Sequence, residues 1–207
     1  IATGFASHTE GQSTTAAVSG SHAEGVSSTA AGLYSHTEGG STYAAGLYSH
    51  AQGQGTFVNQ LGSHVEGYQT TINDFTNSDN TFSHAEGKNH TNNNANLVHL
   101  EGEGHTNTGV SFIHLEGLNN TATTFTQRAT PKHVEGISNF ISDTGHAEGK
   151  QTTASSGTLL MNSQHVEGEE TKVYQSDAGH SEGFQAETQH SNFSHAQGYS
   201  TAVGDSA

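Results

Sequence analysis

Small and polar residues alternate in a five-residue unit, Ser-His-Ala-Glu-Gly, that recurs with small variations along the chain. Successive side chains of a β-strand point to opposite faces. The first, third and fifth residues of this pentad therefore share one face, and the second and fourth share the other. The third position is small or apolar throughout, as in Ala23, Val65 and Leu100. We expect each pentad to be a strand with Ser, Ala and Gly facing an interior and with His and Glu facing away from it.

The spacing of the pentads predicts how these strands are connected. The pentad histidine occurs thirteen times, at intervals of 14, 14, 14, 14, 20, 15, 15, 19, 13, 19, 15 and 15 residues. Helical hairpin repeats need about 33 residues or more, so this period excludes them. It suits a coil of two short strands, for example one that ends at Gly39 and one over residues 42–46, with glycine supplying positive φ at each corner. The sequence thus predicts an all-β, parallel solenoid of 13 or more short coils.

Composition fits a repeat protein with a thin core. The 207 residues include 26 Gly, one Pro, no Cys and no Trp, and 29% are hydrophobic, whereas a compact domain has about 45–50% apolar residues. Solenoids tolerate this because stacking of neighbouring repeats supplies their stability. The formal charge of -15 disfavours contact with nucleic acid or with an anionic membrane. The absence of cysteine excludes disulfides and thiolate metal sites.

The second and fourth pentad positions vary far less than the rest of the repeat. Histidine is constant, and only Gln replaces Glu. A solvated face should drift among polar residues, and glutamates about 4.8 Å apart should repel one another. We therefore expect three rolls to bury this face around a threefold axis as a parallel homotrimer, with His and Glu hydrogen-bonded within or between chains. The predicted trimer-axis ladder comprises His8, Glu10, His22, Glu24, His36, Glu38, His50, Gln52, His64, Glu66, His84, Glu86, His99, Glu101, His114, Glu116, His133, Glu135, His146, Glu148, His165, Glu167, His180, Glu182, His195 and Gln197.

Such a ladder should respond to protonation. Neighbouring glutamates should raise the pKa of each histidine, and protonated histidines should lower the pKa of each glutamate. Assembly would then weaken at pH values above the raised pKa of the histidines and below the lowered pKa of the glutamates. Three symmetry-related imidazoles also suit Zn²⁺, Ni²⁺, water or an anion, but glutamate already offers a partner in every layer, so no metal or other cofactor is assigned. His90 and His105, each three residues after a pentad glycine, are expected to form a surface pair.

The repeat resembles the head repeats of trimeric autotransporter adhesins. The stretch Ser21-His22-Ala23-Glu24-Gly25, with Ala30, Gly32 and Ser35 after it, carries the resemblance, which extends over essentially the whole chain. It implies a left-handed parallel β-roll that trimerises. His and Glu stand where that family has Val and Ile, which favours a polar ladder over an apolar interface. The pentads also resemble repeats of phage tail fibres and related virion proteins. Both resemblances imply an extracellular location, on a cell surface or virion, and attachment to a host glycan or surface protein.

Longer intervals place insertions near residues 68–82, 118–131 and 150–163 of a single repetitive segment, 1–207, which we expect to belong to a longer fibre protein. Extra residues in a solenoid loop outward from the stack. Polar and aromatic residues on exposed loops suit contacts with glycans or proteins. The candidate recognition positions are Asp74, Phe75, Asn77, Asp79, Phe125, Gln127 and Arg128.

No catalytic residue is predicted, because histidines and carboxylates that recur at regular intervals are architectural rather than a singular constellation. A glycan depolymerase of the tailspike kind would need carboxylates at a unique site, for which Asp74 and Asp79 are the loop candidates. An ice-binding solenoid would need a regular threonine row, and the row that begins Thr14, Ser28 does not continue as one. The sequence favours a structural and adhesive segment of a trimeric fibre, either an adhesin head or a tail fibre.

Overall fold

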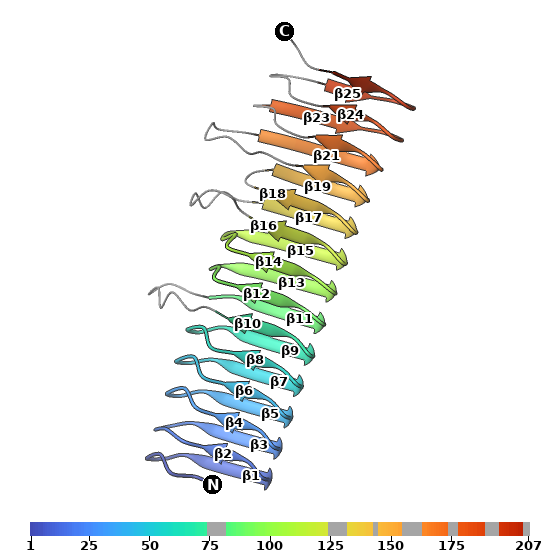
Figure 1. The fold of residues 1–207 in the computed structure, drawn as a ribbon. Helices are drawn as coiled ribbons and strands as arrows, with labels where there is room; N and C mark the ends of the chain where they lie inside the picture. The colour runs from blue at the N-terminus through green and yellow to red at the C-terminus, as the bar shows by residue number, and fades with distance from the viewer. Residues whose placement is uncertain are drawn as a thin grey trace. The chain divides into compact units, whose positions relative to one another are not determined.

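The computed structural model describes residues 1–73, 82–123, 132–142, 145–154, 163–173, 178–188 and 195–204. Within these ranges all regular secondary structure is β-strand and all strand pairs are parallel, which confirms the predicted all-β parallel solenoid. No helix in these ranges is long and apolar enough to cross a membrane. The chain divides into two compact units, Ile1–Gly104 and His105–Ala207, each built from the same coil (Figure 1).

Each coil of the first unit contains one long and one short strand. The long strands form one parallel sheet in the order β1 (His8–Gln12), β3 (His22–Val26), β5 (His36–Gly40), β7 (His50–Gln54), β9 (His64–Tyr68), β11 (His84–Lys88) and β13 (Val98–Glu103). The short strands form a second parallel sheet in the order β2 (Thr15–Ala16), β4 (Thr29–Ala30), β6 (Tyr43–Ala44), β8 (Phe57–Val58), β10 (Thr71–Asn73) and β12 (Thr91–Asn93). The second strand of the coil is therefore shorter than the five residues expected over 42–46.

The second unit repeats this arrangement. Its long strands are β15 (Ile113–Leu118), β17 (Lys132–Ile137), β19 (Gly145–Lys150), β21 (Ser163–Glu169), β23 (Ala178–Glu182) and β25 (His195–Gln197). Its short strands are β14 (Thr106–Thr108), β16 (Thr121–Thr123), β18 (Phe140–Ser142), β20 (Thr153–Ala154), β22 (Lys172–Val173), β24 (Glu187–Thr188) and β26 (Ala202–Val203). The candidate recognition residues of the expected insertions lie outside the described residues, namely Asp74, Phe75, Asn77, Asp79, Phe125, Gln127 and Arg128.

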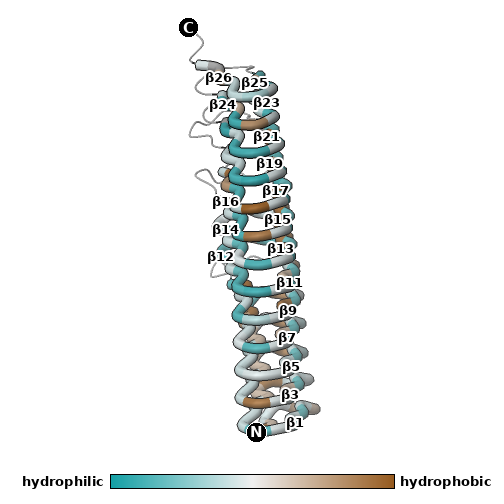
Figure 2. The backbone as a smooth tube through the Cα atoms, turned by 90° about the vertical axis from the view of Figure 1, so that its right-hand side faces the viewer, coloured by the Kyte–Doolittle hydropathy of each residue, from teal (hydrophilic) through white to brown (hydrophobic). Residues whose placement is uncertain are grey.

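Identical pentad positions lie side by side in the long-strand sheet, since His22 pairs with His36 and Ala23 with Thr37. The third position is fully buried in the coils of β3 and β7, where Ala23 and Ala51 are 0% exposed, and Ser21 is 1% exposed. The first and third pentad positions therefore face inward as predicted, whereas the pentad glycine, such as Gly25, is only half-buried. In Figure 2 most of the tube is teal or white, with brown at isolated positions of individual coils, as expected for a core built largely from small residues.

Glycine has two separate roles in the coil. Gly39 has φ of 111°, and a Cβ there would lie 2.1 Å from the carbonyl oxygen of Gly53 in the next coil. Gly32 lacks a positive φ, yet a Cβ there would lie 2.0 Å from the carbonyl oxygen of Gly46. The corner itself uses a left-handed residue two positions after the pentad glycine, such as Ser41 with φ of 56°. The expectation that glycine supplies positive φ at each corner is thus correct for Gly39 and wrong for Gly32. Glycine is needed at position 32 because the next coil packs too closely for a side chain.

The residue three positions after the pentad glycine points into the interior and braces the corner. Ser28 Oγ donates a hydrogen bond to the carbonyl oxygen of Gly39 at 2.9 Å. Asn139 Nδ2 donates to the carbonyl oxygen of Glu135 at 2.6 Å. Thr14 occupies the same corner position and is 4% exposed. Because this row is interior, it does not provide the exposed threonine face that ice binding would need.

His90 and His105 occupy this interior corner position, so the expectation that they form a surface pair is wrong. Both are 0% exposed. His90 Nε2 lies 2.9 Å from the carbonyl oxygen of Glu86, where Asn139 makes the equivalent bond in the second unit. His105 Nδ1 accepts a hydrogen bond from the backbone N–H of Asn120 at 3.1 Å. Desolvation lowers the pKa of His90, although backbone hydrogen bonds oppose it, so we assign it a structural role as a neutral imidazole.

Candidate functional site: the His/Glu ladder

The His/Glu ladder is the outward row formed by the second and fourth pentad residues of the long strands. Its parallel register aligns His22 with His36 and Glu24 with Glu38 in the first unit. The side chains of His22 and Glu24 remain 36% and 32% exposed. The structure therefore places the predicted ladder residues on the outward face and brings those of successive coils together within each unit. Whether this row lies on a trimer axis stays a prediction.

Imidazole rings of neighbouring coils stack on one another along the ladder. Ring centroids are 4.7 Å apart for both His22–His36 and His36–His50, with planes within 4° of parallel. The pair His64–His84, which spans the 20-residue interval, is 5.1 Å apart and tilted by 44°. The pair His8–His22 at the start of the described coils meets edge-on at 64°. Ring geometry therefore does not follow coil length, since His146 and His165, 19 residues apart, also stack at 4.9 Å with planes within 5° of parallel.

Histidine and glutamate of one coil approach each other more closely in the second unit than in the first. His180 Nε2 lies 3.2 Å from Glu182 Oε2, within hydrogen-bonding distance. In the first unit the corresponding distance is 3.7 Å for His22–Glu24, which is too long for a hydrogen bond. The Nε2 atoms of the first unit that are covered from solvent and make no hydrogen bond belong to His22, His36, His50, His64 and His84. A buried nitrogen without a hydrogen bond is unusual, and these nitrogens are open to a further contact.

Burial, with the neighbouring imidazoles as the second cause, lowers the pKa of three ladder histidines. Burial first, and the neighbouring His64 and His36 next, lower the pKa of His50 to about 4. Burial and His22 lower the pKa of His36 although Glu24 and Glu38 oppose them, and burial with His64 and His99 lowers the pKa of His84. Glutamates act to raise the pKa of His36 and His84 as expected, but burial and neighbouring imidazoles outweigh them, so the expected net rise of the histidine pKa is wrong at these positions. Partly desolvated imidazoles in a close stack disfavour charge more than the carboxylates favour it.

Exposed apolar side chains border the ladder on one side, a feature that the search for chemistry in the sequence missed. They stand two residues before the ladder histidine, and we call them the apolar border: Tyr34, Tyr48, Phe82 and Leu97, which are 53%, 60%, 54% and 41% exposed. Tyr34 and Tyr48 stack at 5.3 Å. Phe82 and Leu97 line an open pocket together with His64, His84 and His99, which shows that border and ladder adjoin. The recurrence of large apolar residues at this repeat position was the available signal.

Left-handed backbone makes the apolar border costly. Tyr34 and Tyr48 both have φ of 56°, and Leu97 has φ of 54°. Bulky residues rarely adopt this region, and sparsely populated conformations of this kind cluster at functional sites. Gly20 and Gly62 fill the same repeat position with φ of 66° and 60°. Since glycine fits this position without strain, the large side chains point to a use for the border.

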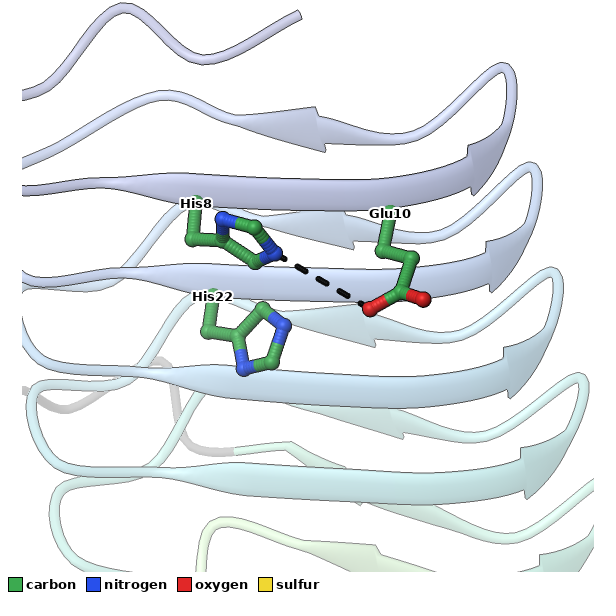
Figure 3. Close-up of side chains that lie close together, drawn as sticks. All are labelled: His8, Glu10 and His22. Carbon is green, nitrogen blue, oxygen red and sulfur yellow. Dashed lines mark ion pairs between the residues drawn. The ribbon is translucent and has the colours of Figure 1, made fainter.

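Adjacent coils of one chain also bring groups of metal-ligand type together. In three groups of the first unit, two histidines and a glutamate place ligand atoms within 4.8 Å of one another: His8–Glu10–His22, His22–Glu24–His36 and His36–Glu38–His50. Figure 3 shows the first group, in which the rings of His8 and His22 come from neighbouring coils and lie on the same side of Glu10. His8 Nε2 and Glu10 Oε2 are 3.9 Å apart. Sequence reasoning considered imidazoles from three chains and missed this arrangement within one.

No protein family, curated protein or solved structure matches this chain. The chemistry of the site therefore rests on its own geometry. A ladder of this kind can bind an identical ladder through hydrogen bonds and stacked rings, or it can hold cations between a carboxylate and two imidazoles.

Proposed function

We propose that this chain is a structural and adhesive segment of an extracellular fibre, in which three copies of a left-handed roll associate in parallel around the His/Glu ladder. The observation that carries this proposal is the apolar border beside the ladder. Monomeric proteins rarely leave contiguous apolar side chains exposed unless the surface serves binding. Tyr34, Tyr48 and Phe82 each remain more than half exposed.

The periodicity of this surface selects the partner. The ladder recurs once per coil, and the imidazoles from His22 to His50 are 4.7 Å apart. The border follows the same repeat but is interrupted where Gly20 and Gly62 occupy its position. A partner that contacts every coil equivalently must present groups with the same axial spacing. A second copy of this chain, aligned in parallel, has that spacing over its whole length. The resemblance to trimeric adhesin heads supports three copies rather than two.

Apolar contacts and polar pairs would make different contributions to this interface. A large aromatic side chain buries about 150–250 Å² when it is fully covered, so the border supplies most of the hydrophobic contribution. The ladder supplies register, because a shift by half a coil would place imidazoles opposite gaps. Side chains about a third exposed, such as those of His22 and Glu24, have little left to bury and act chiefly through specificity.

Attachment is the second half of the proposal. A rigid fibre holds recognition elements away from the surface that anchors it, and loops that project from a solenoid are suited to contact other molecules. We propose the residues of the first two insertions for contact with a host glycan or surface protein, on a cell surface or virion. No catalytic role is proposed for the ladder.

The oligomeric state tests the proposal directly. The chain at tens of micromolar should have the mass of three copies in multi-angle light scattering or native mass spectrometry. The double substitution Tyr34→Ser, Tyr48→Ser should shift it towards monomers without loss of the β circular dichroism signal, because serine already adopts left-handed φ at Ser41. Tyr43→Ser is the matched control: Tyr43 is 37% exposed on the short-strand sheet and stacks on Phe57. A monomeric parent chain would overturn the proposal, as would equal dissociation in the control.

A further inference from the structure

We propose that the first unit binds divalent transition-metal ions such as Zn²⁺ or Ni²⁺ between adjacent coils of a single chain, and that its three overlapping His–Glu–His groups hold two ions. This inference goes beyond the fibre assembly and does not depend on it. The ligands come from one chain: the outer groups are His8–Glu10–His22 and His36–Glu38–His50, and the middle group is His22–Glu24–His36.

The donor set fits such ions. Imidazole nitrogen and carboxylate oxygen are ligands of Zn²⁺ and Ni²⁺, with bonds of about 2.0–2.2 Å. Ligand atoms around a tetrahedral ion are then about 3.3 Å apart, by the geometry of those bonds. The atoms of each group already lie within 4.8 Å of one another. Rotation of partly exposed side chains can close the difference while the strands that carry them stay in place.

A separate observation is that three of these imidazoles lack a hydrogen bond at Nε2. The Nε2 atoms of His22, His36 and His50 are covered from solvent and make no hydrogen bond. The nearest carboxylate in the coil of His22 is at 3.7 Å, beyond hydrogen-bonding distance. Buried nitrogens of this kind carry an energetic cost until something satisfies them. An ion between two coils would be bound by these nitrogens and by the carboxylate together.

Sharing of ligands limits the number of ions. The middle group uses His22, which belongs to the first outer group, and His36, which belongs to the other. A ring nitrogen has a single lone pair for a metal. Filling both outer groups therefore leaves the middle group without its imidazoles. Ions in the outer groups would also be two coils apart, roughly 10 Å, where their repulsion is largely screened at physiological ionic strength.

The next coil lacks the carboxylate, because Gln52 stands in the ladder position of glutamate. With Gln52 in this coil, an ion here would have two neutral imidazoles and a neutral amide oxygen as ligands. No negative charge would then stabilise the ion. Among the residues that the structure describes, the convergent groups all lie on the N-terminal side of Gln52. The substitution Glu→Gln therefore occurs naturally within the ladder, which makes it a suitable test that leaves the fold intact.

Equilibrium dialysis of the full chain against ZnCl₂, after treatment with EDTA, tests the inference, with bound zinc counted by elemental analysis. The parent chain should bind two ions in its tightest class of sites. Glu10→Gln and Glu38→Gln should each reduce this number to one, since each removes the carboxylate of an outer group. Glu24→Gln is the matched control in the same row, one coil away from both, and should still bind two.

Four outcomes would overturn the inference. The first is that the parent chain binds no zinc tightly, and the second is that its number of bound ions follows the total number of ladder histidines. The third is that the Glu24→Gln control loses as many ions as the other two variants, and the fourth is that the parent binds one ion for every three chains. Circular dichroism of each variant shows whether it is folded. The mass of the chain in EDTA is measured in parallel, so loss of trimer without zinc bears on the fibre proposal and zinc stoichiometry per chain bears on this one.

Discussion

Histidine occupies two contrasting environments in the first unit. His90 lies in the interior corner, 0% exposed, with its Nε2 atom 2.9 Å from the carbonyl oxygen of Glu86. His36 and His50 lie on the outward ladder, where their Nε2 atoms are covered but make no hydrogen bond. The chain satisfies the first kind by itself. The second kind is incomplete within one chain, which is why we look to it for contacts with other copies or with ions.

The comparison also shows that repeat position decides the environment, whatever the residue type. His90 stands three residues after a pentad glycine, where other coils have Ser28 or Asn139. Like Asn139 it bonds to the carbonyl oxygen of the pentad glutamate of its own coil, whereas Ser28 bonds to the pentad glycine of the next coil. A ladder histidine stands three residues before the pentad glycine and points the opposite way. The alternation of side chains along the strand directs the ladder histidine outward, and the turn after the strand directs His90 inward.

The largest expected effect comes from adding a side chain at the pentad glycine, which ends the ladder part of the strand and precedes the interior corner. Gly39→Ala should destabilise the fold by roughly 3 kcal/mol, because it combines a strained φ with a backbone clash in the next coil. Gly40→Ala is the neighbouring control, since a Cβ there would meet only Gln54 Cγ at 3.9 Å. Thermal unfolding of both variants measures the difference. Equal melting temperatures would show that the close approach of coils is not needed.

Replacing the interior histidine should have the next largest effect. His90→Leu leaves the carbonyl oxygen of Glu86 without its side-chain donor and should cost about 2 kcal/mol. His90→Asn should cost about 1 kcal/mol or less, because Asn139 makes the equivalent bond in its own coil. Urea unfolding measures both. If Leu and Asn were tolerated equally, the corner hydrogen bond would contribute nothing specific.

Acidification should weaken the fold through the outward histidines by a smaller amount. The folded pKa of His36, His50 and His84 lies below the usual 6.5, at about 4 for His50. The unfolded chain then binds more protons between those values, so stability is constant above about pH 6.5 and falls as pH drops towards 4.

A pH series of melting temperatures in EDTA should show a fall of a few degrees over this range, and His50→Gln should reduce it. A melting temperature that rises on acidification would contradict the sign, and would indicate that the glutamates dominate instead.

The smallest effect is expected where glutamine interrupts the ladder. Gln52→Glu places a carboxylate in the coil of His50 and should raise the pKa of His50 above its present value of about 4. Stability at pH 7 should change by less than about 1 kcal/mol, because the pair is partly exposed. Titration of the His50 ring followed by NMR measures the shift. An unchanged pKa would mean that burial alone controls this imidazole.

Several features of the fold were predictable because they follow from short-range alternation. The parity of the pentad correctly placed Ala23 inside and His22 outside. The buried position of His90 was not predictable in this way, because its sequence neighbours suggest a surface turn. Only alignment with Ser28 and Asn139 identifies the interior corner. The lowered pKa of His50 was also missed, since it depends on ring-to-ring distances and burial that no single repeat displays.

The sequence by itself determined a parallel coil, its two-faced pentad and the constancy of histidine and glutamate, because strand alternation and a period of about 14 residues leave few other arrangements. Only the tertiary structure decided which atoms are satisfied. Stacking brings residues 14 positions apart into contact, and the distances across that contact determine whether an imidazole finds a hydrogen bond, is desolvated by its neighbour or joins a ligand group. Those distances depend on how one coil packs on the next, which is information that no isolated repeat contains.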